Sequence, residues 1–318
     1  MSFWRTAVCR NNKLPMPDNV IEINDLTKVY GSHTAVNGMD LTVAANDVYG
    51  LLGPNGAGKS TTIRMLLSLI RPTSGSIRIF GRSLAEDRRE ILRSIGCIIE
   101  KPDFYLYLSA RRNLELFARM SMVQPTAKKI EEMFDLVGLR GRENDPVRTY
   151  SHGMKQRLGL AQALIHDPKL VILDEPTTGL DPQGIIDLRH LILRMKNEMG
   201  KTVILSSHIL SEIELIADSM AIISKGKAIV QGKVTQLLSD DDLLVYIEPV
   251  DMDALRTSLA TSVWADAIDG QDAAELRLRI SKAALPALHT HLERHGVQVY
   301  SLYYRKRLED YFLKLTNA

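Results

Sequence analysis

The sequence lacks several features that would restrict the class of this protein. It contains only two cysteines, Cys9 and Cys97. Their spacing fits neither a disulfide framework nor a metal or redox pair, which indicates a reducing compartment. No run approaches the roughly 18 apolar residues of a membrane-spanning helix. The first residues, MSFWRTAVCRNNKLPMPDN, lack the apolar core of a secretory signal. If the protein works at a membrane, we expect another chain to hold it there.

The sequence also lacks a strong charge of either sign. Its formal net charge is +2, which gives no sign of a polyelectrolyte contact, so we expect no nucleic-acid partner. Hydrophobic residues make up 45% and charged residues 25% of the 318 residues, which is ordinary for a globular protein with a buried core. The length allows one large domain or two moderate ones.

Hydrophobic patterning predicts a mixed α/β fold. Alternation over residues 20–30 and 35–43 predicts two antiparallel strands. Helical periodicity recurs within about 83–166 and predicts a helical subdomain. The runs LVILDEP and KTVILSSH are continuously apolar, as expected of parallel strands covered on both faces. A helix expected over 184–200 lies between them and completes a strand–helix–strand crossover.

The composition shifts near SDDD at 239–242. We therefore expect a flexible lead-in over residues 1–18, a main α/β domain over 19–238 and a small α+β accessory domain over 239–318. Near the end of the last region, Leu308, Tyr311, Phe312 and Leu315 recur at helical spacing. We expect this stripe to pack on its own small domain, and the domain to regulate or dimerise rather than to catalyse.

Residues 53–61 read GPNGAGKST and are typical of a phosphate-binding loop. The glycines let the backbone curl so that successive N–H groups point toward an anion. Lys59 brings a positive charge to the β- and γ-phosphates, and Ser60 offers its hydroxyl to Mg²⁺. An apolar strand precedes the loop and a helix follows it, which favours phosphate at the helix N-terminus. We assign the nucleotide to the whole loop, namely Gly53, Pro54, Asn55, Gly56, Ala57, Gly58, Lys59, Ser60 and Thr61.

Polar side chains follow two further predicted strands. Asp174 and Glu175 end LVILDE, and His208 ends KTVILSSH. Surface acids that cap a strand and a structural histidine are the simpler alternatives. However, three strand ends at one sheet edge form the crevice in which open α/β sheets place ligands. We predict Asp174 and Ser60 as magnesium ligands and Glu175 as the general base. Together with Lys59 and His208, Glu175 forms the predicted catalytic set.

A second motif, YSHGMKQRL, begins at Tyr150. Ser151 is a candidate helix N-cap with a hydroxyl available for a phosphate, and Gly153 allows close backbone approach. This helix start has no obvious task on the nucleotide of its own chain.

In chain order, the phosphate loop, YSHGMKQRL, VILDEPTTGLD and SSH resemble the ATP-binding subunits of ABC transporters over roughly residues 20–235. The resemblance implies a P-loop ABC ATPase core with an antiparallel β subdomain and a helical subdomain. It also implies ATP and Mg²⁺ as cofactors, a second ATPase subunit whose site Ser151 and Gly153 complete, and an integral membrane permease. Nucleotide binding would close the dimer, at the cytoplasmic face of the cell membrane. IIEKPDFYLYLSARRNL and YSHGMKQRL are most similar to the branch that exports bacitracin-type and lantibiotic peptides.

The resemblance assigns further positions. Tyr30 lies where the family stacks an aromatic ring on adenine, although a tyrosine packed on the sheet is the alternative. Asp181 lies at the position of the family's inter-subunit acid. Glu100 stands where glutamine is usual and becomes a candidate metal ligand, and His152 replaces the commoner glycine. Near Glu100, we expect Phe104, Tyr105, Tyr107 and Leu108 either to dock on the permease or to fold inward.

Two other functions remain open at this point. A soluble ABC ATPase acting on ribosomes or DNA usually carries two cassettes or a long coiled-coil insertion, and this sequence shows one phosphate loop and no heptad run. A metabolic P-loop kinase lacks the YSHGMKQRL helix. His289, His291 and His295 have unsuitable spacing for a metal site, and we expect them on a surface helix.

Overall fold

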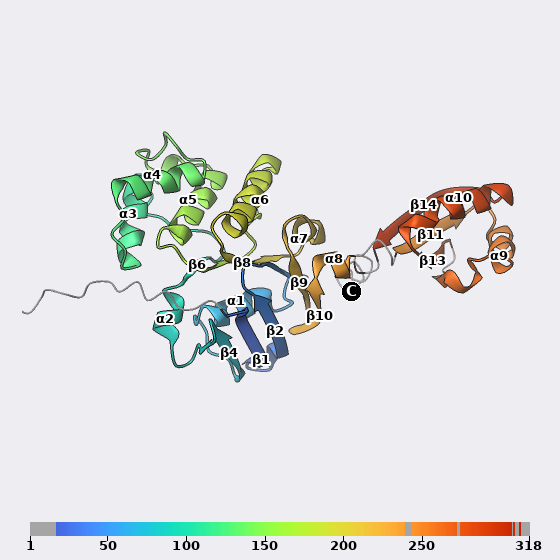
Figure 1. Ribbon diagram of the computed structural model, residues 1–318, viewed down its shortest axis with the longest axis horizontal. Coiled ribbons are helices and arrows are strands. Elements are labelled where there is room, and N and C mark those ends of the chain that lie inside the picture. Colours follow the sequence, from blue (N-terminus) through green and yellow to red (C-terminus); the bar gives the residue numbers. More distant parts are fainter. Residues whose placement is uncertain (1–16, 239–242, 272–273, 307, 309–311, 313–318) are drawn as a thin grey trace, which may run out of the picture.

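The computed structural model describes residues 17–238, 243–271, 274–306, 308 and 312 (Figure 1). Within these residues, two sheets and a group of helices make up the larger part of the chain, and a third sheet with two helices makes up the smaller part. No described helix is long and apolar enough to cross a membrane.

An antiparallel sheet begins the larger part, in the strand order β2-β1-β4-β5. Its strands are β1 (Asn19–Tyr30), β2 (His33–Ala44), β4 (Ser74–Ile79) and β5 (Arg82–Ser83). The pairing of β1 with β2 confirms the two antiparallel strands predicted from alternation. Alternate side chains of this sheet, such as Ile21 and Ile23, enter a buried cluster shared with Leu51 and Ile63. The antiparallel sheet is thereby packed against the strand and helix that flank the phosphate loop.

The central sheet has the strand order β10-β9-β3-β8-β7-β6, and all its neighbouring pairs are parallel except β10 with β9. Its strands are β3 (Val48–Leu52), β6 (Ile95–Ile98), β7 (Leu170–Leu173), β8 (Thr202–Ser207), β9 (Ser219–Ser224) and β10 (Lys227–Lys233). Every residue of β3, β7 and β8 is buried, as expected of strands covered on both faces. Because these strands are parallel, their carboxyl ends meet at one edge.

Helices cover the central sheet and form a group beside it (Figure 1). They are α1 (Lys59–Leu66), α2 (Arg88–Leu92), α3 (Ala110–Met120), α4 (Ala127–Leu136), α5 (His152–Leu164), α6 (Pro182–Asn197), α7 (Leu210–Ile216) and α8 (Val234–Leu237). The region predicted as helical, 83–166, contains β6, which pairs with β7 in the central sheet. Four residues are too short for their periodicity to separate a strand from a helix.

The smaller part has a βαββαβ order and its own core. Its elements are β11 (Leu243–Pro249), α9 (Met252–Ala260), β12 (Ile268–Gln271), β13 (Leu276–Ile280), α10 (Leu285–Arg294) and β14 (Val299–Lys306). The sheet is antiparallel, in the order β12-β13-β11-β14. Val245, Leu278, Leu255 and Leu288 join its strands and helices in one cluster. This part therefore has a hydrophobic core distinct from the cores of the larger part.

Of the three histidines on and just after α10, His289 and His295 are exposed, as expected of a surface helix, and His291 is half-buried. His291 Nε2 lies 3.0 Å from the hydroxyl of Ser258 on α9, so this ring links the two helices. His295 Nδ1 lies 2.9 Å from the carbonyl oxygen of His291 within the same helix turn. No group of three or more potential metal-ligating side chains occurs among the described residues.

The apolar residues near the end of the chain do not pack where we expected. Phe312 is 4% exposed and belongs to the buried cluster of the larger part, together with Ile213 and Val234. Leu308 packs against the same cluster. The expectation that this stripe packs on its own small domain is therefore wrong for these two residues, while Tyr311 and Leu315 lie outside the described residues. Periodicity identifies an apolar stripe but not the surface that it covers.

A polar contact also joins the smaller part to the larger part. Lys306 at the end of β14 forms an ion pair with Glu214 on α7. Figure 1 shows the smaller part on the side of the larger part that carries α7, α8 and β10. Lys306, Leu308 and Phe312 thus contact the larger part.

We expect Phe312→Ala to lower the thermal unfolding midpoint of the full chain. Removal of a buried phenylalanine ring typically costs about 3 kcal/mol or more. The matched control is Tyr300→Ala, which removes an aromatic ring that is 72% exposed on β14. Thermal unfolding of both variants checks the prediction. Equal midpoints for the two variants would show that the Phe312 ring contributes no stability at this contact.

Candidate active site

The phosphate loop joins β3 to α1 and needs glycine at two positions for steric reasons. Gly58 has a φ of 108°, and an ideal Cβ there would lie 2.6 Å from the carbonyl oxygen of Ala35. A Cβ on Gly53 would lie 2.3 Å from the carbonyl oxygen of Ile223. Both distances are too short for a side chain, so glycine allows the loop to lie between β2 and β9. The loop then leads directly into α1, which begins at Lys59.

Lys59 is buried and bound on three sides. Its Nζ donates to the carbonyl oxygens of Gly53 at 2.7 Å and Pro54 at 3.2 Å, and lies 3.5 Å from Glu175 Oε1. Burial lowers the pKa of Lys59, and the negative charges of Glu175 and Asp174 oppose this shift without cancelling it. Phosphate oxygens beside this ammonium group would favour its charged form in the same way.

Asp174, the first residue after β7, is bound by two hydroxyl groups. Its Oδ1 accepts hydrogen bonds from Ser206 at 2.6 Å and from Ser60 at 3.2 Å. Its backbone N–H donates to the carbonyl oxygen of Ile98 on β6. The structure therefore brings two of the three predicted magnesium ligands, Ser60 and Asp174, into direct contact.

Glu175 lies at the centre of the polar cluster. Its φ of 45° is unusual for a residue with a side chain, and its backbone N–H donates to Ser206 Oγ at 2.8 Å. Its Oε2 lies 3.1 Å from His208 Nδ1 and accepts a hydrogen bond from Thr178 at 3.3 Å. The other oxygen, Oε1, faces Lys59. Lys59 and His208 therefore both contact the carboxylate of Glu175, and the three predicted catalytic side chains lie together.

The residues present fit a magnesium ion bound together with a nucleotide. The described residues contain no group of three or more His, Cys, Asp or Glu side chains that could hold a metal alone. Mg²⁺ is commonly bound by one or two protein oxygens, with phosphate and water oxygens as the remaining ligands. Ser60 and Asp174 provide such a pair of oxygens beside the phosphate loop.

Glu100 does not join this pair in the structure. Its carboxylate forms an ion pair with Arg64 of α1, and its side chain is 67% exposed. Its φ of 58° turns the chain just after β6. The carboxylate is therefore paired with a cation on the surface rather than with Ser60 or Asp174.

Tyr30 lies at the hairpin between β1 and β2, where it pairs with His33. Its side chain is 46% exposed, and Lys28 Nζ lies 4.9 Å from its ring centroid. The ring is thus not packed within the sheet. Ala35, whose carbonyl oxygen approaches Gly58, is two residues beyond His33, so the hairpin that carries Tyr30 lies a short way along β2 from the phosphate loop.

Ser151 and Asp181 are N-caps of neighbouring helices. Ser151 Oγ accepts a hydrogen bond from the backbone N–H of Met154 at the start of α5, and Asp181 Oδ1 accepts one from Gly184 at the start of α6. A Cβ built on Gly153 would lie 3.7 Å from Leu180, so the two helix starts lie close together. Among the described contacts, none joins Ser151 or Asp181 to the cluster around Glu175.

Comparison with known proteins gives the family. The ABC transporter family matches residues 36–178. The chain is 40% identical over 299 residues to YhcH of Bacillus subtilis, an uncharacterized ABC transporter ATP-binding protein, and the match covers 93% of this chain and 96% of YhcH. The chain belongs to the ABC transporter ATP-binding proteins. Its α/β fold with a P-loop core, as predicted, is confirmed.

Other relatives of this ABC ATPase belong to the same family. It is 50% identical over 208 residues to the bacitracin transport ATP-binding protein BcrA of Bacillus licheniformis, covering 65% of this chain and 68% of BcrA. It is 46% identical over 212 residues to the lantibiotic transport ATP-binding protein SrtF of Streptococcus pyogenes, covering 67% and 90%. A solved structure of the ATP-binding subunit of an ABC transporter is similar with a TM-score of 0.62 at 30% identity, covering 69% and 91%.

The structure also shows site residues of this ABC ATPase that the sequence analysis missed. Ser206 joins Asp174 to the backbone of Glu175 through its hydroxyl group. Gln156 of α5 donates to the carbonyl oxygen of Pro176 at 3.2 Å and ties the YSHGMKQRL helix to the loop after Glu175. The two serines before His208 were a visible signal, because hydroxyl groups are rare inside an apolar strand. Gln156 gave no such signal, since its burial depends on how α5 packs.

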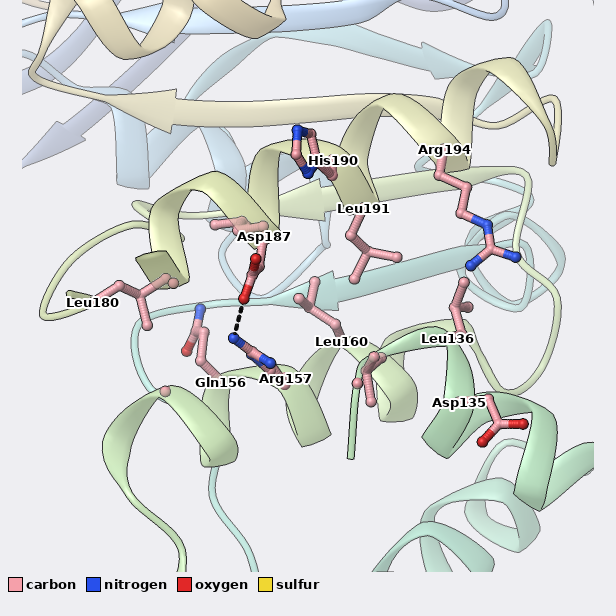
Figure 2. Close-up of a pocket in the computed structure, with 15 residues that line it drawn as sticks. Asp135, Leu136, Gln156, Arg157, Leu160, Leu180, Asp187, His190, Leu191 and Arg194 are labelled. Carbon is pink, nitrogen blue, oxygen red and sulfur yellow. Dashed lines mark hydrogen bonds and ion pairs between the residues drawn. The ribbon is translucent and has the colours of Figure 1, made fainter. Parts of the chain in front are cut away.

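A cavity of about 360 Å³ lies between α5 and α6 of this ABC ATPase, apart from the catalytic cluster (Figure 2). Leucines from both helices line it, and Arg157 of α5 forms an ion pair with Asp187 of α6 across it. Gly153 and Leu180 are part of its wall. The cavity therefore lies next to the two helix starts capped by Ser151 and Asp181, and residues at the end of α4 complete its wall.

Proposed function

We propose that this chain is the ATP-hydrolysing subunit of a peptide exporter, working with a second ATPase subunit and a separate membrane permease at the cytoplasmic face of the cell membrane. The observation that carries the proposal is the meeting of Lys59, Glu175 and His208 at the end of the phosphate loop. The names of BcrA and SrtF, which refer to bacitracin and lantibiotic transport, support cargo of a related chemical class.

In the proposed reaction, Glu175 accepts a proton from the water that attacks the γ-phosphate. His208 holds one oxygen of this carboxylate at 3.1 Å, and Thr178 donates to the same oxygen. Lys59 exchanges a loop carbonyl for phosphate oxygens and neutralises part of their charge. Ser60 and Asp174 would hold Mg²⁺, which would supply further positive charge to the phosphates.

We infer that Ser151, Gly153 and Asp181 act on the nucleotide of the second subunit. Ser151 and Asp181 lie at helix starts, where N–H groups favour an anion. Their described contacts are with their own helices and not with the cluster around Glu175. Nucleotide bound between two subunits would close the dimer, and hydrolysis would remove the γ-phosphate contacts that hold it closed.

The surface proposed for the permease is the loop between β6 and α3. Asn113 of α3 is buried and binds both the N–H and the carbonyl oxygen of Tyr105, at 2.9 and 3.0 Å. Phe104 is 8% exposed and packs edge-to-face on Phe117, whereas Tyr107 is 74% exposed. Phe104 therefore folds inward and holds the loop, while Tyr107 remains on the surface with Tyr105. Exposed aromatic side chains grouped in this way tend to mark protein contacts.

We expect Tyr107→Glu to release the protein from the membrane fraction while ATP binding is retained, because a charge would be desolvated in an apolar contact. The matched control is Tyr300→Glu, a substitution at a tyrosine of similar exposure on β14. Membrane fractionation, cross-linking to the product of the neighbouring reading frame and nucleotide-binding assays check the prediction. If the unaltered protein is wholly soluble in cells and no membrane partner is captured, a soluble ABC ATPase acting on ribosomes or DNA replaces the exporter.

A further inference from the structure

Glu212 in the first turn of α7 binds two hydroxyl groups from different loops. Its Oε2 accepts a hydrogen bond from Ser207 Oγ at 2.7 Å and another from Thr177 Oγ1 at 2.9 Å. Ser207 is the last residue of β8 and is buried. A single carboxylate oxygen therefore joins the end of β8 to the loop that follows β7.

These two hydroxyl groups belong to the segments that carry the proposed catalytic side chains. Ser207 immediately precedes His208, and Thr177 lies two residues after Glu175. His208 and Glu175 in turn approach each other to 3.1 Å. Glu212 therefore links the two segments through Thr177 and Ser207. The contact between His208 and Glu175 links the same two segments a second time, and together these contacts form a closed ring.

The helix that carries Glu212 is fixed on the central sheet. Ile213 is fully buried, and a Cβ built on Gly50 of β3 would lie 2.5 Å from Ile213 Cγ2. The glycine allows α7 to lie directly against the strand that leads into the phosphate loop. Because α7 is held at this depth, Glu212 can hold the two loops at a set distance from the phosphate loop.

A purely local role for Glu212 is the simpler alternative. An acid in the first turn of a helix is favoured by the helix dipole. However, α7 has no side-chain cap, and both described hydrogen bonds to the Glu212 carboxylate come from hydroxyl groups outside the helix. One of these hydroxyl groups, Ser207 Oγ, also accepts a hydrogen bond from the N–H of Ile209 just before α7. The other, Thr177 Oγ1, lies in the loop after Glu175, so Glu212 links the start of α7 to that loop as well.

We propose that Glu212 is a positioning residue that holds the loops of Glu175 and His208 in register for hydrolysis. The inference rests on the proposed function, in which Glu175 is the base and His208 orients it. Among the described hydrogen bonds and ion pairs, none joins Glu212 to a side chain of the phosphate loop, although the carbonyl oxygen of Ser207 accepts a hydrogen bond from the N–H of Gly53. We therefore expect the main effect on the rate of hydrolysis rather than on the binding of ATP.

The test compares Glu212→Ala with Glu212→Gln. We expect Glu212→Ala to lower kcat roughly 10- to 100-fold, as loss of a supporting hydrogen-bond partner commonly does, with little change in the KM for ATP. Glu212→Gln should retain most of the activity, because its amide oxygen can accept both hydroxyl groups. Glu214→Ala is the matched control on the same helix, since Glu214 pairs with Lys306 and touches neither loop.

A double-mutant cycle separates positioning from general damage to the fold. In a His208→Ala background, Glu212→Ala should cause almost no further loss, because both changes act through the same contact. Thr177→Val removes one of the two hydrogen bonds to Glu212 and should give a smaller loss than Glu212→Ala. Ser207→Ala removes the other bond together with the one from the N–H of Ile209, and should also lower the rate of hydrolysis. These variants keep the test decisive even if Glu212→Ala folds poorly.

Two results would overturn the inference. The first is full ATPase activity of Glu212→Ala under conditions in which the separate variant Glu175→Gln is inactive. The second is an additive loss in the His208→Ala background, which would show that Glu212 acts independently of the His208–Glu175 contact. Failure of the proposed function is a different outcome, because Glu175→Gln would then keep its turnover regardless of Glu212.

Discussion

Replacement of Glu175 by glutamine is expected to abolish most ATP hydrolysis while ATP still binds. The amide cannot accept a proton from water, and loss of a general base typically costs about 10²- to 10⁴-fold in rate. The shape of the side chain is kept, and its contacts with His208 and Thr178 can be made by the amide oxygen. Hydrolysis normally opens the closed dimer. Without it, the ATP-bound protein should accumulate in the closed dimeric state.

Phosphate release, nucleotide binding and size-exclusion chromatography in the presence of ATP check this expectation. The matched control is Glu198→Gln, since Glu198 is an exposed acid that pairs with Arg194 on α6. The control should hydrolyse ATP at the normal rate. Undiminished turnover in Glu175→Gln would show that another group is the base.

Replacement of Lys59 is expected to remove nucleotide binding itself. A hydrogen bond to a charged group contributes about 1.5–3 kcal/mol, so Lys59→Ala should weaken ATP binding at least roughly 10- to 100-fold. Lys59 also binds the carbonyl oxygens of Gly53 and Pro54, so its loss also removes support from the loop. Lys59→Met fills a similar volume without a charge and separates the loss of the ammonium group from the loss of packing.

Equilibrium titration with ATP, together with thermal unfolding without nucleotide, checks the second expectation. Lys227→Ala is a matched control, because Lys227 is an exposed lysine on β10. If Lys59→Met binds ATP as tightly as the unaltered chain, the charge at this position does not provide the main attraction for the phosphates.

Much of the site could be predicted because its chemistry depends on local spacing. Gly53, Gly58 and Lys59 are close in the chain, and the geometry of a phosphate loop follows from their order. Asp174 and His208 are recognisable because a polar residue that ends an apolar strand must lie at the sheet edge. Parallel strands then bring such residues together without any knowledge of the side-chain packing.

Other assignments required the folded chain. The four-residue strand β6 was included in a helical region, because so short a segment has no period of its own. Phe104 and Tyr107 are both aromatic and lie three residues apart, so the sequence does not show which of them is buried. The packing of Phe104 on Phe117 and the hydrogen bonds of Asn113 decide this. Glu100 has Arg64 as its partner, a residue 36 positions earlier in the chain.

Short stretches of sequence were enough to predict the phosphate loop, the acids after β7, the histidine after β8 and the membership of an ATPase family, because each depends on residues that are neighbours in the chain. The tertiary structure alone decided that Phe312 packs against the larger part and that Glu212 joins the loops of Glu175 and His208. The physical reason is that burial and hydrogen bonding between distant segments depend on how helices such as α7 lie on the sheet. No local pattern of residues encodes that placement.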